Sequence, residues 1–72
     1  MTLFRFLDLD IDQQTAYVCH GVFLASRIEG KQHVLLYRTS DFFAEIFYDS
    51  RQHRITYIKG FNARTHLLPY GL

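Results

Sequence analysis

The feature that most constrains the fold is a long alternation of apolar and polar residues between positions 22 and 61. Alternation with a period of two is typical of β-strands that bury one face. Short polar connections interrupt the alternation three times, so we expect strands over residues 22–29, 32–38, 42–49 and 54–61. Strands joined by such short turns pair with their neighbours in the chain. The sequence therefore predicts an antiparallel β-meander in the order 1-2-3-4.

Residues 10–20, ahead of the first strand, have the spacing of a short amphipathic helix. Apolar and small side chains recur at intervals of three or four, at Leu7, Ile11, Thr15 and Val18. Asp10 suits the N-cap, because its carboxylate can accept from the backbone N–H of Gln13 while the Gln13 side chain reaches back. Gly21 suits the position after the helix. Residues 8–12 also alternate like a short strand, which leaves the start of the helix open.

These elements make one small α+β domain, residues 1–72, in which one N-terminal helix precedes a four-stranded antiparallel β-meander and a C-terminal tail, residues 62–72. A hydrophobic content of 49% and a charged content of 21% are those of a globular chain. The net charge of +1 creates no field that would attract nucleic acid or anionic lipid, and no apolar run is long enough to span a membrane. Cys19, the single cysteine, cannot form an internal disulfide, so we expect a cytoplasmic protein.

Turn length predicts which residues share a face of the sheet, because turns of even length pair even-numbered with odd-numbered residues. This rule places on one face Val22, Leu24, Ser26, Ile28, His33, Leu35, Tyr37, Phe42, Ala44, Ile46, Tyr48, Ile55, Tyr57, Lys59 and Phe61. It places on the other face Phe23, Ala25, Arg27, Glu29, Val34, Leu36, Arg38, Phe43, Glu45, Phe47, Asp49, Arg54, Thr56 and Ile58. The first face carries less charge and is the predicted seat of the helix; we call the second the mixed face. A bulge would reverse part of this division.

The predicted helix is too small for the predicted sheet. A ten-residue helix is about 15 Å long and about 10–12 Å wide, whereas four strands make a sheet about 19 Å wide and about 25 Å long. The helix covers about half of its own face, and N-terminal Leu3, Phe4 and Phe6 can close some of the remainder together with the tail. The mixed face still carries more apolar surface than a soluble monomer usually exposes, so we expect it to be covered.

The mixed face is the predicted interaction surface. Its aromatic anchors and its arginines are Phe23, Arg27, Arg38, Phe43, Phe47 and Arg54. Aromatic residues and Arg are enriched at protein interfaces, so we expect a non-catalytic protein-interaction or self-association module. The partner is another protein or a second copy of the chain, and a homodimer is the simplest form.

Two alternatives for the mixed face stay open. Interleaved Phe and Arg residues also resemble a stacking platform for single-stranded nucleic acid, although Glu29, Glu45 and Asp49 on the same face would repel phosphates. In the second alternative the tail, residues 62–72, folds back across the mixed face and leaves nothing to bind.

No residue pattern points to metal binding. Asp8, Asp10 and Asp12 resemble the first half of a calcium loop, but Gln13 stands where the sharp turn needs Gly, and Cys19 stands where the bidentate Glu belongs. The histidines lack the close spacing of metal ligands and lie at positions His20, His33, His53 and His66.

No pattern points to catalysis either. Cys19 and His20 are adjacent, and adjacent positions on a helix point their side chains about 100° apart. Glu29 and Glu45, the only Glu residues, lie far apart in the predicted sheet, and the chain has no phosphate-binding loop or dinucleotide fingerprint. We therefore expect neither an enzyme nor a bound cofactor.

The segments 20–27, 34–37, 41–49 and 68–70 are similar to those of a set of short bacterial proteins that have no assigned role. The resemblance covers most of the chain, but it rests on strand patterns and carries no chemistry. It implies a complete single-domain bacterial product and assigns no functional residue.

Overall fold

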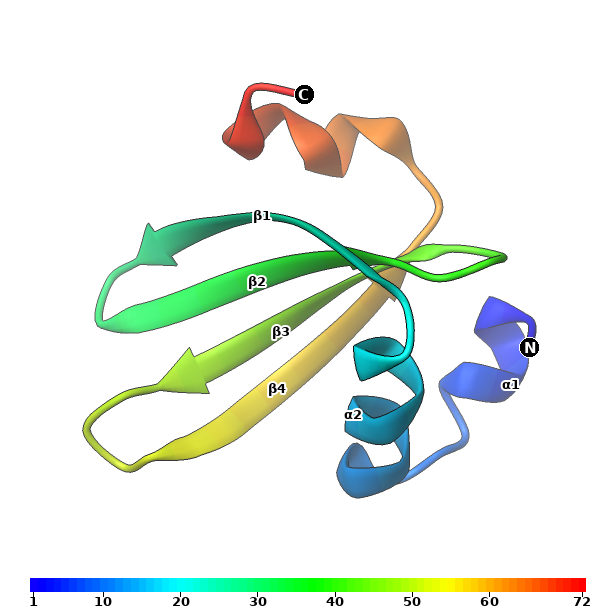
Figure 1. Ribbon diagram of the computed structural model, residues 1–72, viewed down its shortest axis with the longest axis horizontal. Coiled ribbons are helices and arrows are strands. Elements are labelled where there is room, and N and C mark those ends of the chain that lie inside the picture. The colour runs from blue at the N-terminus through cyan, green and yellow to red at the C-terminus, as the bar shows by residue number, and fades with distance from the viewer.

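A four-stranded antiparallel sheet forms the middle of the computed structural model, which describes residues 1–72 (Figure 1). Its strands are β1 (Val22–Glu29), β2 (Gln32–Arg38), β3 (Phe43–Asp49) and β4 (Arg54–Phe61), in the order β1-β2-β3-β4. The predicted α+β class, the antiparallel meander and its strand order are confirmed.

The chain has three short helices where one was expected. These are α1 (Leu3–Phe6), α2 (Ile11–Cys19) and the 3₁₀-helix η1 (Arg64–Tyr70). The prediction of a single N-terminal helix is therefore wrong, because both ends of the chain also form helical turns. None of the three helices has the length and apolar character needed to cross a lipid bilayer.

The predicted cap of α2 is present. The Asp10 carboxylate accepts from the Gln13 backbone N–H at 2.8 Å, and the Gln13 side chain accepts from the Asp10 backbone N–H at 3.2 Å. Gly21 follows the helix, as expected, but its φ is not positive. Close packing explains this glycine better, because a Cβ at Gly21 would lie 2.5 Å from the carbonyl oxygen of Arg38.

Only part of the predicted stripe on α2 is buried. Val18 is fully buried, whereas Leu7 and Ile11 are exposed. The unexpected helix α1 explains this difference, because its Phe6 takes a central place in the core and contacts Tyr17 and Phe42. The buried side of α2 is therefore rotated about the helix axis with respect to the predicted apolar stripe.

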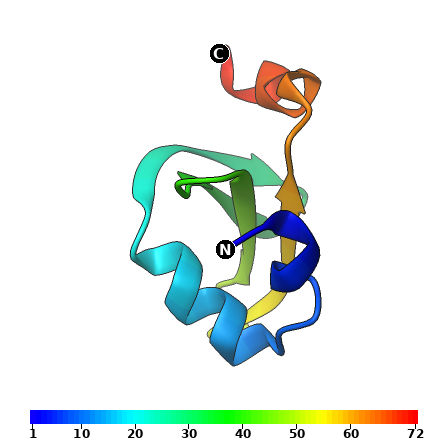
Figure 2. The same cartoon turned by 90° about the vertical axis from the view of Figure 1, so that its right-hand side faces the viewer.

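Helices α1 and α2 lie on one face of the sheet, and η1 lies on the opposite face (Figure 2). On the face covered by α1 and α2, the buried core consists of Phe6, Val18, Phe42, Ala44, Ile46 and Ile58. On the opposite face, Leu67 of η1 packs with Leu36 and Phe61 in a smaller core. The prediction that α2 sits on the less charged face is confirmed by Ala44 and Ile46, which belong to that face.

Two irregularities in the strand pairing move residues from one face to the other. In β1, Phe23 pairs with Tyr37 and Ala25 pairs with Leu36, so Leu24 is an extra residue. The side of every β1 residue before this bulge is reversed with respect to a regular strand. Phe23 therefore lies on the helix side of the sheet, and its predicted place on the mixed face is wrong.

The second bulge lies in β4, where Tyr57 pairs with Phe47 and Ile55 pairs with Tyr48, leaving Thr56 as the extra residue. Beyond Thr56 the predicted sides are wrong for four residues. The bulge moves Tyr57, Lys59 and Phe61 to the mixed face, and Ile58 to the helix side. Regular counting from the turns remains correct for β2 and β3.

Candidate functional site

The C-terminal segment folds across the mixed face. Leu67 of η1 is buried against Leu36 of β2 and Phe61 of β4, and Tyr70 packs against the same small core. Because η1 lies on this face, its apolar center is filled by the chain itself. The alternative prediction, that the tail folds back across the mixed face, is therefore confirmed for the apolar center of that face.

Arg27 is the center of a polar network that holds the tail in place. Its guanidinium donates to Glu45 at 3.1 Å and to Glu29 at 3.2 Å, and it lies 5.4 Å from the centroid of the Tyr70 ring. The Tyr70 hydroxyl donates to the same Glu45 oxygen at 2.6 Å. Glu45 is only 2% exposed, so its carboxylate depends on these two donors. The charge of Arg27 is therefore engaged inside the chain.

Burial and the hydrogen bond to the Glu45 carboxylate raise the pKa of Tyr70 well above its ordinary value of 10.0. Both effects favour the neutral phenol, since burial disfavours a phenolate and the neighbouring carboxylate would repel one. Tyr70 therefore keeps its proton, and its hydrogen bond, at neutral pH.

Of the other predicted site residues, four remain on the mixed face and only Phe23 lies on the opposite face. Phe43 stacks on Phe61 with ring centroids 5.7 Å apart, and Phe47 packs on Tyr57 at the same distance.

The two remaining arginines, Arg38 and Arg54, are exposed, form no ion pair and lie at opposite ends of the mixed face. Phe23, on the other face, packs edge-on against Tyr37.

The helix-side face of the sheet carries no Asp, Glu, Lys or Arg. After the two bulges its residues are Phe23, Ser26, Ile28, His33, Leu35, Tyr37, Ala44, Ile46, Tyr48, Ile55, Ile58 and Gly60. In the predicted division of faces, Lys59 was the one charged residue on this face, but the β4 bulge moves it to the mixed face. An uncharged sheet face can be buried by a partner without desolvating a charge.

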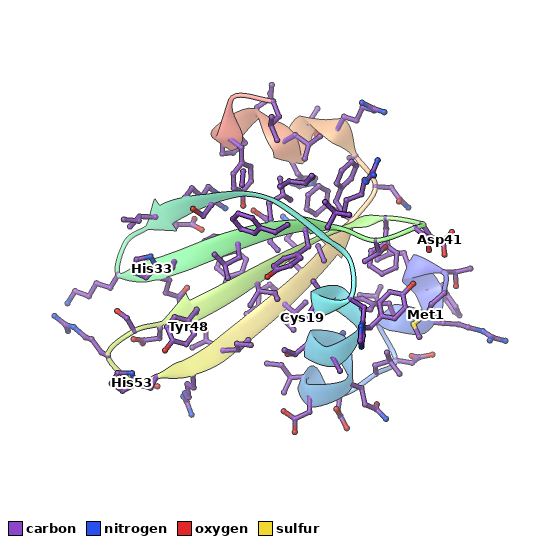
Figure 3. All side chains as sticks on the ribbon, in the orientation of Figure 1. Met1, Cys19, His33, Asp41, Tyr48 and His53 are labelled. Atoms are coloured by element: carbon purple, nitrogen blue, oxygen red, sulfur yellow. The ribbon has the colours of Figure 1, made fainter.

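The helices cover only part of this face. Helices α1 and α2 lie at one end of the sheet, and the part that extends toward the two hairpin turns has no layer above it (Figure 3). We define the open face as the incompletely covered residues Ile28, His33, Leu35 and Tyr48, which lie toward the turns, together with Phe23 and Tyr37 at the start of β1 and the end of β2. Phe23 is 53% exposed and Ile28 is 70% exposed. Ile28 is the most exposed large apolar side chain of the sheet.

One flank of α2 borders the open face. Ile11, Thr15 and Cys19 recur every four residues and form a stripe on the helix. Tyr17 lies about 180° around the helix from this stripe, on the side of Phe6 and α1. Because α1 and the hairpin turns lie to opposite sides of α2, the stripe is turned toward the turns (Figure 1). It adds no charge to the surface.

Five of the six open-face residues were assigned to the helix side from the sequence, whereas Phe23 was assigned to the mixed face, and the extent of their exposure was not predicted. Ile28, Leu35 and Tyr48 were assigned to the helix side, where N-terminal residues and the tail were expected to close the gap. The tail lies on the other face instead, and Phe4 points away from the core, 81% exposed. The signal was present in the dimensions, because one short helix cannot cover four strands.

A hollow of about 410 Å³ lies between the end of α2 and the β2–β3 turn, and His20, Arg38 and Thr39 help to line it. The Thr39 hydroxyl is already bound to the backbone of Phe42 through two hydrogen bonds. No group of three His, Cys, Asp or Glu side chains is placed to hold a metal ion. The chain matches no protein-family model, no curated protein and no solved structure.

Proposed function

We propose that this protein is a non-catalytic protein-interaction module that binds its partner through the open face. The observation that carries the proposal is an uncharged, incompletely covered sheet face with Phe23 and Ile28 more than half exposed on it. Contiguous exposed apolar surface of this kind marks interaction sites in soluble proteins. The site therefore differs from the predicted mixed face, which the tail occupies in part.

Burial of the open face supplies the driving force for binding. Full burial of a Phe or Ile side chain contributes about 1.5–3 kcal/mol, so the remaining burial of these two contributes about half as much each. Leu35, Tyr37 and Tyr48 add smaller amounts, because they are already partly covered. The surface is suited to a partner that is apolar where it meets these side chains and carries its charges at the edge of the contact.

Single-stranded nucleic acid is the less suitable partner. Stacking platforms combine aromatic rings with cations that follow the phosphate backbone. The open face has the rings but no Lys or Arg. On the mixed face the charge of Arg27 is paired with Glu45 and Glu29, and the two unpaired arginines lie at opposite ends of the face. We expect no binding of short oligonucleotides at low salt, where electrostatic help is greatest.

Site-specific photo-crosslinking in cells tests the proposal. A photoreactive phenylalanine replaces Phe23 in one variant and Tyr57 in the control. Tyr57 is a matched control, because it is 57% exposed, close to the 53% of Phe23, and lies on the mixed face. We expect discrete protein adducts from position 23 and none from position 57. Adducts from position 57 alone, or none from position 23, would overturn the proposal.

A further inference from the structure

We infer that the open face binds a second copy of this chain, in a twofold dimer in which α2 of each copy lies on the open face of the other. The inference rests on the proposed function and adds the identity of the partner. Its basis is the distribution of unpaired charge around the helix-side face, together with the shape of that face.

The exposed side-chain charges without an ion pair are opposite in sign at the two ends of the helix-side face. At the start of α2 lie the carboxylates of Asp8, Asp10 and Asp12, none of which forms an ion pair. At the far end, Lys31 lies in the β1–β2 turn and Arg51 in the β3–β4 turn, both exposed and both without an ion pair. The acidic and basic ends are separated along the long axis of the molecule (Figure 1).

We place a twofold axis parallel to this face, in the contact between the two copies and midway between α2 and the hairpin turns. Rotation about it puts the α2 end of one copy over the turn end of the other. The start of α2 in one copy then meets the turns of the other copy, twice in each dimer. Complementary charge of this kind fixes the orientation of partners and suppresses other arrangements. A partner without this charge pattern would leave both ends unmatched.

The shape of the face favours the same arrangement. Helix α2 lies at one end of the sheet, and no helix lies over the part that extends toward the hairpin turns (Figure 1). Two packed helices have axes about 8–10 Å apart and span about 20 Å, which fits a sheet about 25 Å long. Each sheet would then be covered by its own α2 and by the α2 of its partner.

The outward side of α2 is compatible with this contact. Asp12 and Ala16 are exposed and lie on the side of α2 away from Val18, which faces the core. Ala16 is small, so the helix backbone can come close to the second sheet. Asp12 is near the start of the helix, where the twofold axis brings it toward the turns of the other copy.

Sedimentation equilibrium of the purified chain with charge-reversal variants tests the inference. The contact area is small, so we expect the wild type to dimerise with a Kd of about 10–100 µM. Asp12→Lys and Arg51→Glu each place like charges together and should weaken the dimer about tenfold. The double variant restores opposite charges and should return to within about threefold of the wild type.

Arg64→Glu is the matched control, because Arg64 is an exposed, unpaired arginine at the start of η1 on the other face. We expect it to change the Kd by less than about twofold. Arg51 lies in a turn, so Arg51→Glu keeps the test open if Asp12→Lys disturbs α2. A Kd weakened equally by Arg64→Glu, or a double variant as weak as the single ones, would overturn the inference.

The two proposals fail in different ways. A wild-type chain that stays monomeric at about 1 mM, while position 23 crosslinks to a different protein, overturns the dimer and leaves the interaction module standing. A monomeric chain without adducts from position 23 overturns both. Adducts with the mass of two copies of this chain, with the expected order of Kd values, support both.

Discussion

Three residues from distant parts of the chain, Arg27, Glu45 and Tyr70, decide what the mixed face can do. Glu45 is the only acidic residue that is buried, and a buried carboxylate is tolerated when it is paired and hydrogen-bonded. Arg27 supplies the charge, and the Tyr70 hydroxyl supplies the second donor at 2.6 Å. The network therefore fastens the tail to the sheet and withdraws Arg27 from any role in recognition.

Replacing Tyr70 with Phe tests this fastening. The hydrogen bond to a charged acceptor is lost, so we expect the free energy of unfolding in urea to fall by about 1–2 kcal/mol at pH 8. Tyr57→Phe is the control, because the Tyr57 hydroxyl lies on an exposed side chain of the same face; its effect should stay within about 0.5 kcal/mol. Equal effects of the two substitutions would contradict the role of Tyr70.

The difference in the free energy of unfolding between the wild type and Tyr70→Phe depends on pH, and the sign of this dependence follows from the raised pKa of Tyr70. The pKa of Tyr70 is raised in the folded state. The Tyr70 hydroxyl therefore makes its full contribution to the free energy of unfolding at pH values below 10.0, the ordinary pKa of the group. Above that pH the unfolded chain releases the proton while the folded chain still holds it. The difference in stability between wild type and Tyr70→Phe should therefore narrow as the pH rises from 8 to 11. A difference that widens would contradict the assigned cause.

At the level of elements, regular patterns were predictable and irregular ones were not. The four strands, their order and the α2 cap follow from alternation and from the spacing of Asp10 and Gln13. Helix α1 has four residues, too few to show a helical period, and η1 contains Pro69. The two bulges leave no composition signal, yet they decide the faces of Phe23 and Lys59.

The position of η1 has a direct test in two neighbouring leucines. Leu67 is buried against the sheet, whereas Leu68 is 70% exposed. We expect Leu67→Ala to lower the free energy of unfolding by about 2–3 kcal/mol, and Leu68→Ala to change it by less than about 0.5 kcal/mol. Chemical denaturation followed by circular dichroism measures both. If Leu67→Ala were as mild as its neighbour, η1 would not be docked on the mixed face.

The whole molecule is a sheet with incomplete layers on both sides. Only 12 of 72 residues are buried, so the chain has little core to spare and gains much from further burial. Its own tail supplies that burial on the mixed face, whereas on the open face the helices supply only part of it. The sequence predicted that one surface would need a cover, but the choice of surface depended on the bulges and on the direction taken by the tail.

Methyl NMR at increasing protein concentration tests the dimer on the open face most directly. Ile28 and Leu68 are matched probes, because both are 70% exposed and they lie on opposite sides of the sheet. Between about 10 µM and about 1 mM, the Ile28 methyl signal should shift along a curve with the Kd from sedimentation, while the Leu68 signal stays in place. A shift of Leu68 without a shift of Ile28, or no shift of either, would contradict the account.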